Sequence, residues 1–356
     1  MNIMVISSLS QQSGSSIRNR GICLGLSSFK HSVEYIEPQR TEKIKFLIAA
    51  SRAILKCVFL KYDVVLAMKP FPNACIPAIL AKYARGSKII LDIDDVEYLY
   101  HKNLLIKKLF IFFHCLFPGF FDRVTVHNYA LEKFVKEKSG RVVKKESILS
   151  LPQGIDHAMF QGVARDLRLE ERLGIKGYRV LIYAAHLGVA SSLSQILFIL
   201  KDITRNKKDL KLLIIGGGSH LEFYRNMSSR IGIADKVVFT GYLKHTEVPK
   251  YMKLGDVALN YFENPEMNKY RSPIKIREYL ALGIPVVCNG GGDSELFSRF
   301  IDICPDMEGY KAKILEVLDN PPYSRIDEAR QFILRQYDWK ECLRHFDSEL
   351  QRLTKR

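Results

Sequence analysis

The sequence lacks any apolar run long enough to cross a membrane. Its longest uncharged apolar stretch, Leu109–Phe121, is interrupted by His114 and Pro118 and is shorter than the ~20 residues that a transmembrane helix needs. The chain begins MNIMVISS, where no cationic segment precedes an apolar one, so we interpret this region as a first strand and not as a secretion signal. We therefore expect a cytoplasmic protein, either free or resting on a membrane surface.

Cysteine pairs at metal-binding spacing are also absent. The seven cysteines are odd in number, widely scattered and include no C-x-x-C spacing. This predicts free, mostly buried thiols in a reducing compartment and argues against a zinc site. The sequence also has no internal repeat at solenoid periods and no low-complexity tract. With 47% hydrophobic residues, the chain is expected to be globular.

Acidic residues are too few to balance the basic ones. The 356 residues include 54 Lys+Arg and 38 Asp+Glu, which gives a net charge of +16. Residues 1–160 hold 23 basic and 13 acidic residues (+10), and residues 161–356 hold 31 and 25 (+6). Such a surface attracts polyanions, so nucleic acid, an anionic membrane and phosphorylated substrates are all open as partners.

Short apolar segments alternate with helical stretches, as in parallel βαβ units. The first half contains the expected strands Ile3–Ser7, Val33–Ile36, Val64–Ala67, Lys88–Asp92, Arg123–Val126 and Ser147–Leu151. The second half contains Val180–Ala184, Lys211–Ile215, Lys236–Phe239, Val257–Asn260 and Pro285–Cys288. The pattern predicts an α/β protein with two Rossmann-like, doubly wound domains, residues 1–165 and 166–336, facing a cleft at the carboxyl ends of their strands. A charged amphipathic helix pattern over Tyr323–Arg356 breaks around Tyr337–Trp339, and residues 337–356 are expected to pack back on the first domain.

The most informative local segment is RSPIKIREYLALGIPVVCNGGGDSEL, Arg271–Leu296. Ser272-Pro273 reads as a helix start, since the hydroxyl can cap and proline suits the first helical position. Lys275 lies in the first turn, where the helix dipole disfavours a cation unless an anion is near. Glu278 lies one turn further on, where an acidic residue can accept hydrogen bonds from a ribose.

This block, SPxKxxEYxAxGxPVV, occurs with LPQGID at Leu151–Asp156, IIGGGSH at Ile214–His220 and FTG at Phe239–Gly241. In this combination the sequence resembles retaining glycosyltransferases of the GT-B fold, family 4, over nearly its whole length. The resemblance implies transfer of a sugar from a UDP- or GDP-linked donor to a lipid-linked or polysaccharide acceptor in bacterial surface glycan synthesis. It also implies that neither a metal nor another cofactor is needed.

The resemblance carries a set of donor-binding residues across. Glu278 would hold the donor ribose, while the family's other carboxylate of this motif falls on Tyr270. The family's pair of diphosphate cations is absent, with His186, Lys275 and Arg271 as candidate substitutes. The full expected donor set is Gly14, Ser15, His186, Gly217, Gly218, Tyr242, Arg271, Ser272, Pro273, Ile274, Lys275 and Glu278.

On the acceptor side, the family's histidine–aspartate pair aligns with Asp94-Asp95 in LDIDDVEYL. These carboxylates are expected to orient or polarise the acceptor hydroxyl, and His127 in TVHN is a further catalytic candidate. The protein's work in such a reaction is positioning, together with stabilisation of the charge that develops on the diphosphate.

Structural interpretations of the same residues stay open. Asp94 and Asp95 could cap the following helix, Glu278 could pair with Lys275 or Arg277, and the glycines at 216–218 could only form a tight turn. The cationic and apolar segment Lys102–Phe121 fits either a buried helix or an interfacial membrane anchor, and Thr41–Lys61 is the other anchor candidate.

Two other functions are compatible with parts of the sequence. One is a nucleotide-sugar epimerase of the same fold, although the motifs fit transferases better. The other is a basic nucleic-acid-binding protein, which would need aromatic and cationic residues interleaved on an exposed face. No recognisable nucleic-acid-binding motif is present in the sequence, so no nucleic-acid partner is expected.

Overall fold

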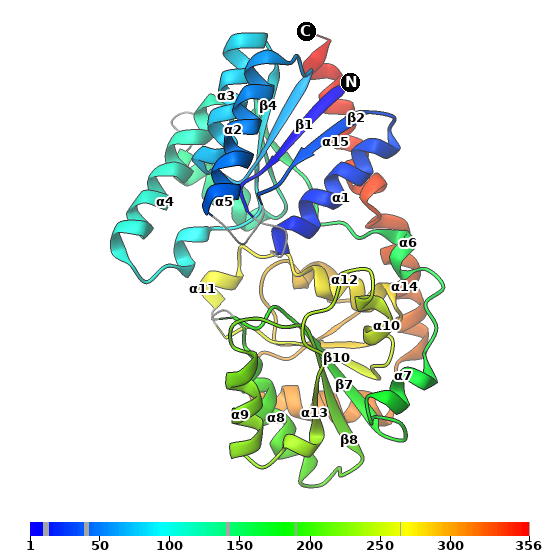
Figure 1. Cartoon of the computed structure of the whole chain (residues 1–356). Coiled ribbons are helices and arrows are strands. Elements are labelled where there is room, and N and C mark those ends of the chain that lie inside the picture. Colours follow the sequence, from blue (N-terminus) through cyan, green and yellow to red (C-terminus); the bar gives the residue numbers. More distant parts are fainter. Residues whose placement is uncertain (10–13, 39–42, 140–142, 189–190, 264, 356) are drawn as a thin grey trace. The chain divides into compact units, whose positions relative to one another are not determined.

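The chain forms two compact units in a computed structural model that describes residues 1–9, 14–38, 43–139, 143–188, 191–263 and 265–355 (Figure 1). Unit 1 comprises Met1–Ile155, Lys269–Ser272 and Tyr337–Arg356, and unit 2 comprises Asp156–Asn268 and Pro273–Gln336. The division falls at Ile155 and not near residue 165, because the Ile155 backbone pairs with Tyr337 and Trp339 of unit 1. Residues 156–165 therefore belong to unit 2.

Unit 1 is built on a six-stranded sheet in which every neighbouring pair is parallel. Its strands are β1 (Asn2–Ser7), β2 (Ser32–Ile36), β3 (Val64–Met68), β4 (Lys88–Ile93), β5 (Arg123–Val126) and β6 (Ile148–Ser150). The order β2-β1-β3-β4-β5-β6 reverses direction between β1 and β3, where open α/β sheets bind ligands beyond the carboxyl ends of their strands.

Helices cover both faces of this sheet. They are α1 (Gly14–Ser28), α2 (Lys43–Phe59), α3 (Pro72–Arg85), α4 (Leu104–Leu116), α5 (Tyr129–Ser139) and α15 (Trp339–Thr354). Alternate residues of β4 face opposite sides, as a pleated strand requires: Ile89 and Leu91 join the core with α2, α3 and α5, whereas Ile90 joins the core with α1 and α15.

The pairing of α1 with α15 depends on glycine. A Cβ at Gly21 would lie 2.0 Å from Trp339 Cε2, and one at Gly25 would lie 2.2 Å from Leu343 Cδ1. The buried indole of Trp339 therefore fills space that Gly21 leaves open, and the Leu343 side chain fills the space at Gly25. Helix α15 follows α14 (Tyr323–Gln336) after a break at Tyr337–Asp338, as the sequence pattern predicted.

Unit 2 repeats the architecture. Its strands are β7 (Arg179–Ala184), β8 (Leu210–Ile215), β9 (Val237–Phe239), β10 (Val257–Asn260), β11 (Val286–Cys288) and β12 (Asp302–Ile303). The sheet is parallel, in the order β12-β11-β10-β7-β8-β9, so the order reverses between β7 and β10. The strand β12 was not predicted, because two residues give no period.

The helices of unit 2 lie between and after these strands. They are α6 (His157–Phe160), α7 (Leu167–Arg172), α8 (Leu193–Thr204), α9 (Leu221–Arg230), α10 (Val248–Met252), α11 (Pro265–Asn268), α12 (Ile274–Ala281), α13 (Met307–Asp319) and α14. Helices α8, α9 and α13 bury Ile196, Tyr224 and Tyr310 against the sheet. On this evidence both sheets are parallel and flanked by helices, which confirms the predicted α/β class.

The cysteines are free thiols, as expected. Cys57, Cys75 and Cys288 are buried and the other four are only partly buried, so the expectation of mostly buried thiols was wrong. Among the described residues, no helix has both the length and the apolarity to span a bilayer.

Candidate functional site

Helix α12 carries the central residue of unit 2. Pro273 is the N-cap residue and the helix begins at Ile274, with no side-chain cap, so Ser272 does not cap this helix as expected. The hydroxyl of Tyr279 accepts a hydrogen bond from the Ala184 amide over 2.8 Å. This bond holds α12 at the carboxyl end of β7, beside the point where the strand order reverses.

Glu278 is completely buried and is bonded through both oxygens. Lys275 Nζ lies 3.0 Å from its Oε2, and His245 Nε2 lies 3.0 Å from its Oε1. Burial by itself would raise the pKa of Glu278, but the charge of Lys275 and the hydrogen bond from His245 outweigh it and lower the pKa to about 2. The carboxylate is therefore ionised and fixed in place at neutral pH.

His245 was missed by sequence reasoning. It lies between β9 and α10, 33 residues before Glu278, and no sequence spacing links the two positions. Both partners of Glu278 stay accessible to solvent, since the side chains of His245 and Lys275 are 30% and 25% exposed. The cluster thus presents the partly exposed Lys275 ammonium and His245 imidazole around a buried anion.

Three loops meet at the same carboxyl edge of the unit 2 sheet. A Cβ at Gly216 would lie 2.1 Å from the Ala185 oxygen, and one at Gly218 would lie 2.2 Å from the Leu187 oxygen. Gly217 approaches the next loop, where its Cβ would lie 2.8 Å from the Tyr242 nitrogen. Glycine at 216 and 218 is therefore required by backbone packing alone, which supports the structural interpretation of this motif.

These contacts bring several of the predicted donor residues together. Gly217 O accepts a hydrogen bond from Leu187 N over 3.0 Å, which places His186 and Tyr242 on loops that flank the glycine turn. Both side chains are exposed. His186, Gly217, Gly218 and Tyr242 hence share one edge with α12, and their donor contacts remain predictions.

Arg271 and Ser272 belong to unit 1, as do Gly14 and Ser15. At the start of α1, the Ser16 hydroxyl donates to Glu37 Oε1 over 2.6 Å, and Arg20 donates to Glu37 Oε2 over 2.9 Å. A carboxylate therefore already lies beside this helix start. A diphosphate bound by the backbone amides of α1 would be repelled by the Glu37 carboxylate, so the structure does not favour that predicted contact.

The predicted carboxylates follow β4 and lie beside a buried lysine. Lys69 follows β3 in a left-handed conformation (φ 76°), its Nζ lies 2.5 Å from Asp94 Oδ1, and it also contacts Glu97. Burial alone would raise the pKa of Asp94, but Lys69 lowers it to about 2. Lys69, Glu97 and His114, whose Nε2 lies 3.0 Å from Glu97 Oε2, were not singled out from the sequence.

Asp95 has a different environment from its neighbour. Its Oδ1 accepts from the Val96 amide over 2.8 Å and its Oδ2 accepts from the Tyr100 hydroxyl over 2.7 Å. Burial raises its pKa to about 6, and the charges of Glu97 and Asp94 add to that increase while Lys69 opposes it. Neither carboxylate caps the short helix Glu97–Tyr100, which has no side-chain cap.

His127 anchors a backbone segment. Its Nε2–H donates to the Tyr270 oxygen over 3.0 Å, and the neighbouring Asn128 side chain donates to the Arg271 oxygen over 3.1 Å. These two bonds tie His127 and Asn128 to the backbone of the Tyr270–Arg271 segment, so this geometry favours an anchoring role. A catalytic role for His127 stays a prediction.

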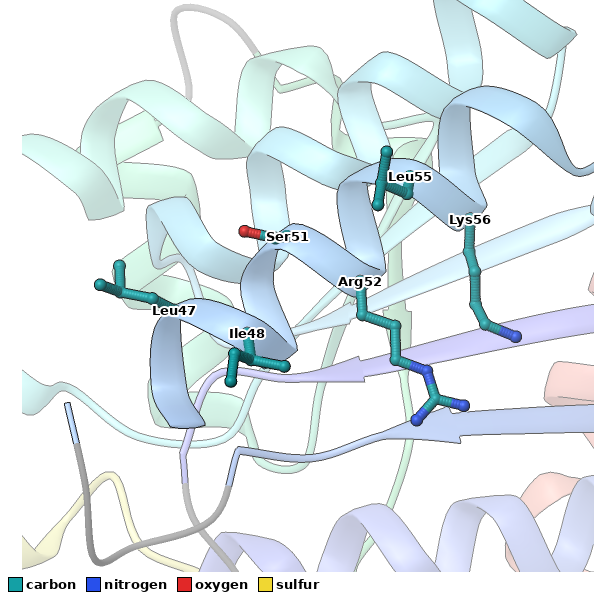
Figure 2. A pocket seen from close by; sticks show the side chains of 6 residues that line it. All are labelled: Leu47, Ile48, Ser51, Arg52, Leu55 and Lys56. Carbon is teal, nitrogen blue, oxygen red and sulfur yellow. The ribbon is translucent and has the colours of Figure 1, made fainter. Parts of the chain in front are cut away.

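A row of apolar and basic side chains lies on the outer face of α2. Leu47, Ile48, Ser51, Arg52, Leu55 and Lys56 line a shallow groove there (Figure 2). Figure 2 shows Arg52 and Lys56 pointing to one side of the helix and Leu55 pointing away from them. On α4, Leu104, Leu105, Leu109 and Phe112 are exposed as well, so this helix is not the buried one that its composition also allowed.

The fold is that of GT-B glycosyltransferases, and residues 167–336 match the family model described as glycosyl transferases group 1. The chain superimposes on HepE from Anabaena in complex with UDP with a TM-score of 0.75 and 13% identity, over 99% of this chain and 100% of that one. This match shows the shared fold. Among the described residues, no group of three or more His, Cys, Asp or Glu side chains is arranged to hold a metal ion.

Two curated relatives are similar over part of the chain. Alpha-monoglucosyldiacylglycerol synthase of Streptococcus pneumoniae is 23% identical over 197 residues, 50% of this chain and 43% of that protein. GDP-mannose-dependent alpha-(1-6)-phosphatidylinositol monomannoside mannosyltransferase of Mycolicibacterium smegmatis is 32% identical over 109 residues, 30% of this chain and 28% of that protein. The chain thus spans less than half the length of the curated relatives it matches.

Proposed function

We propose that the protein is a glycosyltransferase that moves a sugar from a nucleotide-sugar donor, with retention, to a lipid-linked or polysaccharide acceptor in bacterial surface glycan synthesis. The observation that carries this proposal is the buried, ionised Glu278 held by Lys275 and His245 at the carboxyl end of β7. It lies within the segment that matches the glycosyltransferase family model. The names of both curated relatives refer to a glycolipid, which supports a lipid-linked acceptor here.

In this proposal unit 2 binds the donor. The Glu278 side chain has no exposed surface, so Lys275 or His245 has to move aside before a ribose hydroxyl reaches one of its oxygens, each of which can accept more than one hydrogen bond. The Lys275 ammonium has three donors, and those not directed at Glu278 can reach a phosphate oxygen. His186 and the backbone of Gly217 and Gly218 would contribute further donors at the same edge. A UDP- or GDP-linked sugar is the co-substrate, and no metal is required.

The bond from the anomeric carbon to the diphosphate oxygen breaks, and the bond from that carbon to the acceptor oxygen forms on the same face. The hydroxyl proton of the acceptor passes to the departing diphosphate oxygen. The side chains of Asp94 and Asp95 are assigned to the orientation of the acceptor hydroxyl, so the protein acts by positioning and by stabilising developing charge.

We further propose that unit 1 rests on the anionic inner face of the plasma membrane. Exposed apolar side chains on α4 lie close in sequence to Lys102, Lys107 and Lys108, and those on α2 lie beside Arg52 and Lys56. An interfacial helix combines an apolar face with cations that attract anionic lipids. A lipid-linked acceptor would meet the enzyme at such a surface.

Thermal unfolding of the purified protein with UDP-, GDP- and ADP-linked sugars tests the donor step. A ligand present at about 100 times its dissociation constant stabilises the folded state by about 2.7 kcal/mol, so one class of nucleotide sugar should raise the melting temperature clearly. If none of the three does so, the proposal is wrong. Analysis of the products then separates the functions, because an epimerase converts the nucleotide sugar without an acceptor whereas a transferase labels the lipid.

A further inference from the structure

A four-residue segment of the chain belongs to unit 1 although the residues on both sides of it belong to unit 2. Lys269–Ser272 follows α11 and directly precedes the Pro273 cap of α12. Within unit 1 the backbone of this segment is held by His127 and Asn128. The Tyr270 ring packs edge-on against Phe134, with centroids 5.7 Å apart. The segment is thus fixed by its backbone and one aromatic side chain, which leaves the direction of Arg271 well defined.

The Arg271 side chain contacts the phenol of Tyr100. Its Nε lies 2.9 Å from the Tyr100 hydroxyl oxygen and its guanidinium carbon lies 5.2 Å from the centre of the same ring. The Tyr100 hydroxyl in turn donates to Asp95 Oδ2 over 2.7 Å. A phenol hydroxyl can donate one hydrogen bond and accept others. Arg271 therefore donates to the Tyr100 hydroxyl, and the Tyr100 hydroxyl donates to Asp95.

This chain of hydrogen bonds distinguishes Asp95 from Asp94. Asp94 forms an ion pair with the buried ammonium of Lys69. Asp95 instead takes its side-chain hydrogen bond from a neutral hydroxyl, which Arg271 polarises, and linked hydrogen bonds strengthen one another. Both oxygens of Asp95 are thus held in place by neutral donors, and each oxygen keeps a lone pair that can accept a hydrogen bond from a substrate hydroxyl.

We propose that Asp95 is the carboxylate that orients the acceptor hydroxyl and that Tyr100 and Arg271 are positioning residues that hold Asp95, so that Arg271 acts on the acceptor side and not on the donor. This inference rests on the proposed function. In the transfer step, Asp95 accepts a hydrogen bond from the acceptor hydroxyl and stays ionised. We call the hydrogen-bonded series from Arg271 through Tyr100 to Asp95 the relay. Tyr100 and Arg271 do not touch the reacting atoms.

The ionisation of Asp95 is the quantity that the relay controls. The groups that face it are Lys69 beyond β3, Asp94 and Glu97 on its own segment, Tyr100, and His114 on α4, whose pKa is itself raised by Glu97. Because the Tyr100 hydroxyl favours the charged form, its removal should raise the pKa of Asp95 above the value of about 6. Asp95 orients a hydroxyl only when ionised, so the acidic limb of the pH–rate profile should move with it.

The test uses Tyr100→Phe, Arg271→Met and the double variant, with Tyr98→Phe as the matched control. Tyr98 lies in the same short helix, but its ring packs on the core with Phe134 and His114. We expect Y100F to lower kcat about tenfold at pH 7 and to shift the acidic limb upwards. R271M should do the same to a smaller extent, the double variant should be no worse than Y100F, and Y98F should behave as the wild type.

Donor affinity separates this inference from the proposed function. R271M should bind the nucleotide sugar as tightly as the wild type, whereas an arginine on the diphosphate would lose affinity. A weaker donor complex, additive effects of the two substitutions, or an unmoved acidic limb would each overturn the relay. Carbon-13 NMR of the aspartate carboxyls, with Asp95→Asn for assignment, follows the ionisation of Asp95 without turnover, and an unchanged titration in Y100F would overturn the relay even in a protein that binds no donor.

Discussion

The ammonium of Lys69 lies 2.5 Å from the carboxylate of Asp94, and this ion pair gives two consecutive aspartates opposite properties. The pKa of Asp94 is lowered to about 2 and that of Asp95 is raised to about 6. Two carboxylates whose environments separate their pKa values are commonly given different tasks in active sites.

The pH dependence of folding should show this difference. The folded state favours the ionised form of Asp94, so Asp94 stabilises the protein above its unfolded pKa of 3.8, and that contribution is lost as the pH falls towards 2. The folded state favours the protonated form of Asp95, so its contribution is present below pH 3.8 and is lost as the pH rises through about 6. Asp95→Asn should therefore raise the melting temperature at pH 7.5 and leave it nearly unchanged at pH 4.

Asp94→Asn is the matched control, because it removes the partner of a buried ammonium. It should lower the free energy of unfolding at pH 7.5 by about 2 kcal/mol. Denaturant unfolding at both pH values measures both variants. A loss of stability in D95N at pH 7.5 would contradict the assigned environments.

Helix α1 should tolerate no side chain at Gly21. A Cβ there would lie 2.0 Å from the indole of Trp339, so Gly21→Ala forces α15 or the indole to move. Overpacking of this kind costs about 1–3 kcal/mol. Ser27→Ala on the exposed side of the same helix is the control and should cost less than about 1 kcal/mol, apart from its bond to the Cys23 oxygen. Equal stability of G21A and the wild type in urea would show that α15 does not pack as described.

His245 should support donor binding through Glu278. His245→Ala removes one of the two bonds that hold the carboxylate, while Lys275 keeps it ionised. We expect the nucleotide-sugar dissociation constant to rise about three- to tenfold and the melting temperature to fall, because a buried carboxylate loses one of its two partners. His345→Ala, at an exposed position of α15, is the control. An unchanged dissociation constant in H245A would remove His245 from the donor site.

Membrane binding should depend on the exposed apolar side chains of α4. Leu105 and Phe112 are 76% and 54% exposed, so Leu105→Glu with Phe112→Glu should preserve the fold. The double variant should no longer sediment with anionic vesicles, because it loses apolar contact and gains like charge. Phe223→Glu, which changes a residue of unit 2 that is 57% exposed, should sediment normally. Binding of the wild type should weaken as salt shortens the Debye length. Equal binding of the wild type to neutral and anionic vesicles would contradict the proposed attraction between basic side chains and anionic lipids.

The sequence predicted the strands well and the site in part. Buried parallel strands such as β3 and β8 are continuous apolar segments, which are visible without any tertiary information. The donor helix was also visible, because Lys275 and Glu278 are one turn apart and their contact is local. The boundary at Ile155, which was predicted near residue 165, and the strand β12 were not visible, since neither has a periodic pattern.

The residues that sequence reasoning missed act through the fold. Lys69 meets Asp94 only because β3 and β4 are neighbours in the sheet, and a lysine in the left-handed conformation has no sequence signal. His245 reaches Glu278 from another loop, and Tyr100 gains its role from Arg271, which lies 171 residues later in the chain. Contacts of this kind depend on topology, which residue types alone do not specify.

The central claim is that the buried carboxylate of Glu278 binds the donor, and calorimetric titration of a nucleotide sugar into the wild type and Glu278→Gln tests it most directly. The amide keeps the size of the side chain, and a melting curve of each protein verifies the fold. The Lys275→Met/Glu278→Gln double variant shows whether the unpaired lysine disturbs the site. The account predicts that the wild type binds and that E278Q loses at least tenfold in affinity. Equal affinity in the two folded proteins would contradict it.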